Sequence, residues 1–143
     1  MKIIQRTSYY PKSKSQTHIT PDIVFNYIED VYGITKDQLY DPCPADTPYK
    51  APIFFNGLYG SWNDYNFINP PFEIETLTAF VFKAIEQSFE GRTTIALLPA
   101  KTDQRWFHDY IKYRDIQWIR GRLKFKNNKH GATQPHFLVR FQR

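Results

Sequence analysis

Cysteine, long apolar runs and a leader-like start are scarce or missing in this sequence. The single cysteine, Cys43, excludes an internal disulfide framework, so we expect a reducing, intracellular compartment. No run approaches the roughly 18 apolar residues that a membrane-spanning helix needs. Residues 1–6 lack the apolar region of a signal peptide. The sequence therefore predicts a cytoplasmic protein with no membrane partner.

The chain has enough apolar and aromatic material for one core. Of its 143 residues, 41% are hydrophobic and 17% are aromatic, which excludes a disordered or low-complexity chain. The first nineteen residues are polar and show no period. We therefore expect a flexible N-terminal arm over residues 1–19 and one domain over residues 20–143.

Charge is unevenly distributed along the chain, whose net charge is +5. Residues 1–100 carry 8 Lys and Arg against 11 Asp and Glu, whereas residues 101–143 carry 11 against 3. A polyanionic partner is therefore expected to meet the C-terminal part.

The order of the expected elements is typical of an α/β domain. Apolar residues at helical spacing predict helices over 21–32 and 74–89 and a third one after Asp103, with Thr20 and Asp103 as N-caps. Strands are expected at residues 38–41, 66–68, 93–98, 116–119 and 136–141, with 123–126 as a further candidate. This alternation predicts a mostly parallel central sheet.

The tetrapeptide Asn69-Pro70-Pro71-Phe72 follows an expected strand and precedes an expected helix. Open α/β sheets place ligands at such carboxyl ends. A carboxamide oxygen and a carbonyl fixed by prolines can accept both hydrogens of an amino group, and an aromatic ring can stack on a planar heterocycle. The combination indicates a site for the exocyclic amine of a base, although Asn-Pro by itself is also a common turn.

Four cations at every second position indicate a nucleic-acid surface. Arg120, Arg122, Lys124 and Lys126 alternate with apolar residues and glycine, so an extended segment would place all four on one face. Lys101 and Arg105 are expected to extend this surface. The alternative is a solvated edge strand protected by its charge.

Metal chemistry is not indicated, because the four histidines show no metal-ligand spacing. Nothing in the sequence places a base beside Cys43, so we do not expect it to act as a nucleophile. Trp106 and Phe107 are expected to be core residues of the third helix.

From about Thr20 to Phe141 the sequence resembles the phage-type, Dam-like DNA N(6)-adenine methyltransferases. The matching blocks are Thr20-Pro21, Leu39-Tyr40-Asp41-Pro42-Cys43, Asn56-Gly57-Leu58 with Trp62, Asn69-Pro70-Pro71-Phe72, residues 97–108 and Arg120-Gly121-Arg122-Leu123-Lys124-Phe125. Asn56 stands where an acid is usual, and Pro44-Ala45-Asp46 replaces the Gly-x-Gly of many methyltransferases.

The resemblance implies a Rossmann-like fold and a site-specific DNA methyltransferase that acts on adenine. S-adenosyl-L-methionine would be the cofactor, and the methyl group would pass directly to a flipped base. The implied catalytic residues are Asn69, Pro70, Pro71 and Phe72. The implied cofactor residues are Thr20, Pro21, Asp41, Pro42 and Asn56.

Other functions remain compatible with the residues. The same fold can act on the amine of cytosine or on a protein glutamine, and a non-catalytic DNA-binding module would keep the basic segment. The small size predicts weak or short sequence specificity, or help from a second subunit, as in a homodimer. A viral or prophage source, and thus the host cytoplasm, follows from the resemblance alone.

Overall fold

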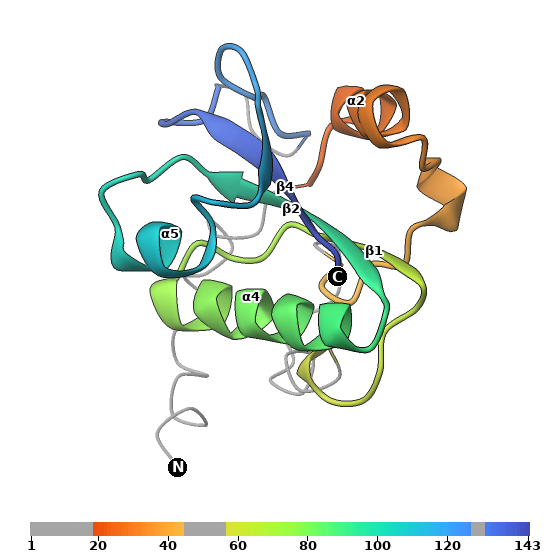
Figure 1. Ribbon diagram of the computed structural model, residues 1–143. Helices are drawn as coiled ribbons and strands as arrows, with labels where there is room; N and C mark the ends of the chain where they lie inside the picture. The colour runs from red at the N-terminus through yellow and green to blue at the C-terminus, as the bar shows by residue number, and fades with distance from the viewer. Residues whose placement is uncertain (1–18, 45–56, 127–130) are drawn as a thin grey trace.

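A mixed β-sheet lies between helices on both of its faces in the part of the chain that the computed structural model describes, residues 19–44, 57–126 and 131–143 (Figure 1). The elements in chain order are α2 (Asp22–Tyr32), the 3-10 helix η3 (Lys36–Gln38), β1 (Tyr65–Ile68), α4 (Ile74–Phe89), β2 (Thr93–Pro99), α5 (Arg105–Tyr110), β3 (Asp115–Trp118) and β4 (His136–Phe141). The expected α/β class is confirmed. No helix in these described ranges is long and apolar enough to cross a membrane.

The four strands lie in the order β1-β2-β4-β3. β1 and β2 are parallel, whereas β4 is antiparallel to both β2 and β3. β1, β2 and β3 therefore share one direction, and β4 alone runs the other way. The sheet is mixed rather than mostly parallel, because the chain turns back after β3 and inserts β4 between β2 and β3.

Two hydrophobic cores cover the two faces of the sheet. On one face, Leu98 and Val139 of the sheet belong to the same core as Phe80 of α4. On the other face, Leu97 belongs to the same core as Ile28 of α2. Neighbouring residues of a strand point to opposite faces. Because both faces are covered, the buried strand β2 reads as a continuous apolar run rather than as an alternating one.

The helices end close to where the sequence predicts, but their caps differ. Gly33 ends α2 with a left-handed φ of 72°, as predicted. Thr20 is not the N-cap of α2: Pro21 is, because its extended ψ of 152° delays the helix to Asp22. Asp103 is likewise not the cap of α5. A turn in which the Gln104 N–H bonds the Lys101 carbonyl at 3.0 Å makes Gln104 the cap.

Two expected strands are not formed. Residues 38–41 contribute only a parallel bridge between Tyr40 and Asn66, because Gln38 belongs to η3 and the chain turns at Asp41. Residues 123–126 stay irregular, since their backbone groups bond to loops. The Lys126 N–H donates to the Ile19 carbonyl at 3.0 Å, and the Leu123 carbonyl accepts the Ala132 N–H at 2.7 Å.

Gly57 lies where a side chain does not fit. A Cβ atom at this position would overlap the carbonyl oxygen of Pro42 and lie 3.1 Å from the Phe80 ring. The backbone at Gly57 is thus packed directly against the turn that follows Tyr40.

We therefore expect Gly57→Ala to lower the free energy of unfolding by about 1–3 kcal/mol, because the backbone must move to relieve the overlap. Urea unfolding followed by circular dichroism measures this. Gly131→Ala is the matched control, since its nearest neighbour would be at 3.4 Å, and we expect a change of less than about 0.5 kcal/mol. An unchanged unfolding midpoint for Gly57→Ala would contradict the close packing.

Candidate active site

The tetrapeptide Asn69-Pro70-Pro71-Phe72 lies at the carboxyl edge of the sheet, as predicted. It follows β1 directly, and the parallel strand β2 ends beside it before Lys101. The antiparallel strand β4 begins at the same edge, because His136 is opposite Pro99. Three chain segments that are far apart in the sequence therefore meet at one place.

Asn69 and Thr20, which the sequence assigned to catalysis and to cofactor binding, are in direct contact. The side-chain amide Nδ2 of Asn69 donates a hydrogen bond to Oγ1 of Thr20 at 3.0 Å. Asn69 is buried, with 8% of its surface exposed. Since the nitrogen is turned to Thr20, the carboxamide oxygen is on the side away from it. The Thr20 hydroxyl thus orients Asn69 and does not cap α2.

The remaining residues of the tetrapeptide form the connection to α4. Pro70 is buried, whereas Pro71 and Phe72 are half-buried. Two prolines remove two backbone donors, and α4 starts only at Ile74. The connection is therefore outside both the strand and the helix, which leaves its carbonyl groups out of the regular hydrogen-bond pattern.

Asp41 has an exposed carboxylate beside β1. The bridge between Tyr40 and Asn66 aligns the two segments in parallel, so Asp41 lies next to the end of β1. Its Oδ1 accepts the backbone N–H of Cys43 at 2.8 Å, which shapes the turn around the buried Pro42. Asn56, the fifth expected cofactor residue, lies outside the described residues. Burial raises the pKa of the Cys43 thiol, which disfavours the nucleophilic thiolate.

Residues 120–126, hereafter the basic segment, keep the expected alternation without forming a strand. Leu123 and Phe125 are buried in the core on the α2 side, with 7% and 1% of their surfaces exposed. Arg120 and Lys124 are exposed. The segment starts at the carboxyl edge, because the Ile119 N–H donates to the His136 carbonyl at 3.1 Å.

Two cations of the basic segment are engaged within the protein. Arg122 Nη1 donates to the Thr133 carbonyl at 2.8 Å. Lys126 Nζ bonds Asp22 Oδ1 at 2.9 Å, at the start of α2. This hydrogen bond and the positive charge of Lys126 hold the pKa of the Asp22 carboxyl below its ordinary value. The pair therefore joins the basic segment to the residues next to Thr20.

The two further cations lie on the chain after β2. Lys101 is half-buried directly after the strand, and Arg105 is the first residue of α5. The Arg105 side chain is 92% exposed and lies 3.7 Å from a carboxylate oxygen of Asp109. Trp106 and Phe107 are both buried, which confirms that they are core residues.

His136 is a residue of this edge that sequence reasoning missed. It is fully buried, and its ring lies 5.5 Å from the Phe72 ring and 5.3 Å from the Phe125 ring, measured between centroids. The signal in the sequence was a histidine at the start of a mostly apolar strand. Buried histidines are uncommon enough for such a position to indicate a specific environment.

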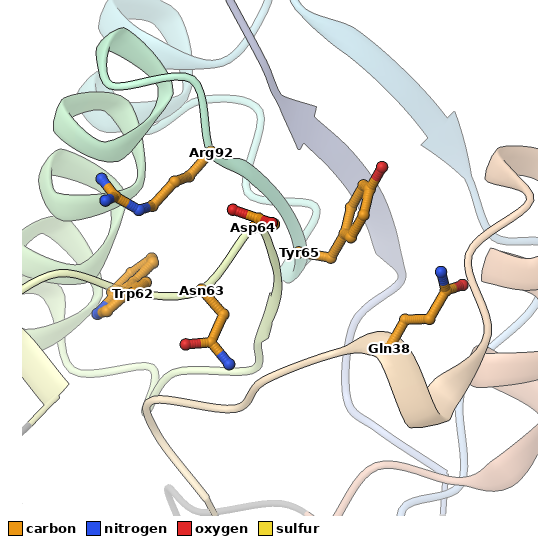
Figure 2. A pocket seen from close by; sticks show the side chains of 6 residues that line it. All are labelled: Gln38, Trp62, Asn63, Asp64, Tyr65 and Arg92. Atoms are coloured by element: carbon orange, nitrogen blue, oxygen red, sulfur yellow. The ribbon is translucent and has the colours of Figure 1, made fainter.

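A separate hollow of about 510 Å³ lies at the opposite, amino edge of the sheet (Figure 2). Its lining residues are Gln38, Trp62, Asn63, Asp64, Tyr65 and Arg92. Trp62 is a core residue, whose indole N–H donates to the Gly57 carbonyl at 2.8 Å. Among the residues that the structure describes, none of those expected to bind cofactor, base or DNA lines this hollow.

The comparison with protein families agrees with the arrangement at the carboxyl edge. The family model described as DNA N-6-adenine-methyltransferase (Dam) matches residues 7–137, which is most of the chain. No curated protein and no solved structure gives a significant match. The match includes the Asn69 tetrapeptide, the basic segment and the start of β4, and the chain belongs to the DNA N-6-adenine-methyltransferase (Dam) family.

Proposed function

We propose that this protein transfers a methyl group from S-adenosylmethionine to the exocyclic amine of adenine in DNA. The family supports the reaction class. The observation that carries the proposal is the contact between Asn69 and Thr20 at the carboxyl edge of the sheet, next to the basic segment. The proposal includes a doubly wound, Rossmann-like fold, in which β4 runs antiparallel to β1, β2 and β3.

The donor set at the edge fits the proposed cofactor. The Asp41 carboxylate is exposed and can accept hydrogen bonds from hydroxyl or amino groups. Thr20 and Pro21 lie at the same edge through the contact with Asn69, and Pro42 continues the turn from Asp41. These four residues would hold S-adenosylmethionine, which supplies, when bound, an electrophilic methyl group that the amine takes up without a covalent enzyme intermediate.

Asn69 would position and activate the target amine. Its carboxamide oxygen and the Pro70 carbonyl accept the two N–H groups, which concentrates electron density on the nitrogen and fixes its direction of attack. The hydrogen bond from Asn69 to Thr20 determines which end of the carboxamide meets the amine. The Phe72 ring would stack on the base once it has left the duplex.

The basic segment would hold the DNA backbone. Phosphate contacts position a protein on DNA and carry no sequence information by themselves. Arg120 and Lys124 are exposed on the segment that Leu123 and Phe125 anchor in the core. A rigid, buried anchor beneath exposed cations is suited to align the duplex with the tetrapeptide.

Methyl transfer from labelled S-adenosylmethionine to unmethylated plasmid DNA tests the proposal. We expect label in 6-methyladenine, and we expect Asn69→Ala to lower kcat by about a hundredfold or more, because a preorganised acceptor is lost. Asn63→Ala is the matched control, since Asn63 lies just before β1, at the amino edge of the sheet. Its activity should equal that of the wild type.

Each other result identifies a different function. Label in 4-methylcytosine would keep the mechanism and replace the substrate. Cofactor binding without label in DNA would point to a protein glutamine. DNA binding without cofactor binding would show that the protein is a non-catalytic DNA-binding module.

Thr20 provides a second test, because its hydroxyl accepts the hydrogen bond of the Asn69 amide. Thr20→Val keeps the shape but removes the acceptor, and we expect it to lower kcat by about tenfold through misorientation of the carboxamide. Thr20→Ser keeps the hydroxyl and should retain most of the activity. Equal activity of the two variants would show that the hydroxyl does not orient Asn69.

The charges of the basic segment predict two opposite effects on DNA affinity, measured by fluorescence anisotropy over a range of salt concentrations. Lys124→Ala should weaken binding and reduce the salt slope by about 1, because one phosphate contact is lost. Asp22→Asn should strengthen binding by up to about fivefold, because it releases Lys126 from an exposed ion pair.

Lys112→Ala is the control for these two variants, since Lys112 lies after α5 near the start of β3, away from the carboxyl edge. It should leave the salt slope unchanged. Weaker binding by Asp22→Asn would show that the pair with Lys126 supports DNA binding instead of competing with it.

A further inference from the structure

His136 lies between the candidate catalytic segment and the basic segment. One side of its ring meets Phe72 of the tetrapeptide at 5.5 Å, with an interplanar angle of 43°. Another side meets Phe125 of the basic segment at 5.3 Å, with an angle of 68°. The imidazole therefore contacts the two segments to which the proposed function assigns the base and the DNA backbone.

The backbone of His136 is held firmly. His136 pairs with Pro99 in the sheet, and its carbonyl accepts the Ile119 N–H at 3.1 Å. The preceding Pro135 carbonyl accepts the Ala100 N–H at 2.8 Å. The backbone of His136 therefore cannot move away from Phe72 without disturbing β4 and its pairing with β2.

The contacts of His136 belong to a closed circuit around the site. Phe125 precedes Lys126, which bonds Asp22 through its side chain and Ile19 through its backbone. Thr20 lies between those two residues and accepts the hydrogen bond of Asn69. From Asn69 the tetrapeptide leads to Phe72, and the contact between the Phe72 and His136 rings closes the circuit. Both ends of the tetrapeptide are thus fixed from outside it, Asn69 by Thr20 and Phe72 by His136.

We propose that His136 is a positioning residue, whose ring between Phe72 and Phe125 holds the Phe72 ring in the orientation that stacks on the target base. The inference rests on the proposed methyltransferase function. Stacking requires a flat surface at a fixed angle, and a half-buried phenylalanine has no such fixed angle unless something packs against it. A flat ring at position 136 supplies this support, whereas a branched aliphatic side chain of similar size does not.

Two substitutions separate ring geometry from simple filling of space. His136→Leu keeps an apolar side chain of similar volume but removes the ring, and His136→Phe keeps a flat ring. Val139→Ala is the control, because Val139 is buried in the same strand but faces the core on the α4 side. All are compared with the wild type at a temperature at which circular dichroism shows each variant folded.

We expect His136→Leu to lower kcat for methylation of unmethylated plasmid DNA by about tenfold, because the base is poorly aligned. The KM for S-adenosylmethionine should stay within about twofold of the wild-type value, since the ring contacts of His136 are with Phe72 and Phe125, which the proposed function assigns to the base and to the basic segment. His136→Phe should keep kcat within about threefold, because the flat support remains. Val139→Ala should lower the free energy of unfolding without changing kcat.

Three results would overturn the inference while leaving the proposed function intact: wild-type kcat in His136→Leu, an equal loss in His136→Phe, or an equal loss in Val139→Ala. The first would show that Phe72 needs no support. The second would assign the effect to the polar imidazole, and the third to general packing. An inactive wild-type protein would instead overturn the proposed function, and with it the role of His136.

Discussion

The pairing of β4 with β2 is the constraint on which the rest of the structure depends. It runs from Thr94 opposite Phe141 to Pro99 opposite His136, through the middle of the sheet. β4 contributes to both cores, since Val139 faces one and Leu138 the other. Because β4 is the reversed strand, it starts where β1 and β2 end. The same reversal that closes the sheet therefore places His136 beside the tetrapeptide.

The carboxyl edge is assembled from chain segments that have little regular structure of their own. Contacts that join these segments are the side-chain bonds of Asn69 with Thr20 and of Lys126 with Asp22, and the backbone bond from Lys126 to Ile19. The cores below hold these segments in place, as Phe125 shows by its burial. The sheet and helices thus fix the position of the site, and the irregular segments carry its polar groups. This arrangement is usual in α/β proteins.

Local sequence patterns predicted helices and strands correctly where packing and intrinsic propensity favour the same structure. The α4 helix and the strand at 136–141 lie where they were expected, because α4 has apolar residues at helical spacing and residues 136–141 form a short, mostly apolar run. The cap predicted at Thr20 was wrong, since its hydroxyl bonds Asn69 far along the chain. The cap predicted at Asp103 was wrong because a local turn from Lys101 to Gln104 makes Gln104 the cap. The pairing of Asp22 with Lys126 spans 104 residues, and no local pattern indicates it. The position of the tetrapeptide at the carboxyl edge was therefore predictable, whereas the contacts that join it to Thr20 and to the basic segment were not.

The position of β4 also has a consequence for the order in which the molecule is made. Residues 136–141 occupy an interior place in the sheet, between β2 and β3. During synthesis, β1, β2 and β3 leave the ribosome first, and β2 and β3 cannot be bridged until β4 follows. Pairing over long sequence separations is slow and leaves strand edges exposed in the meantime. The nascent chain thus carries an open sheet edge, and the candidate site at the carboxyl edge is completed only when β4 is inserted.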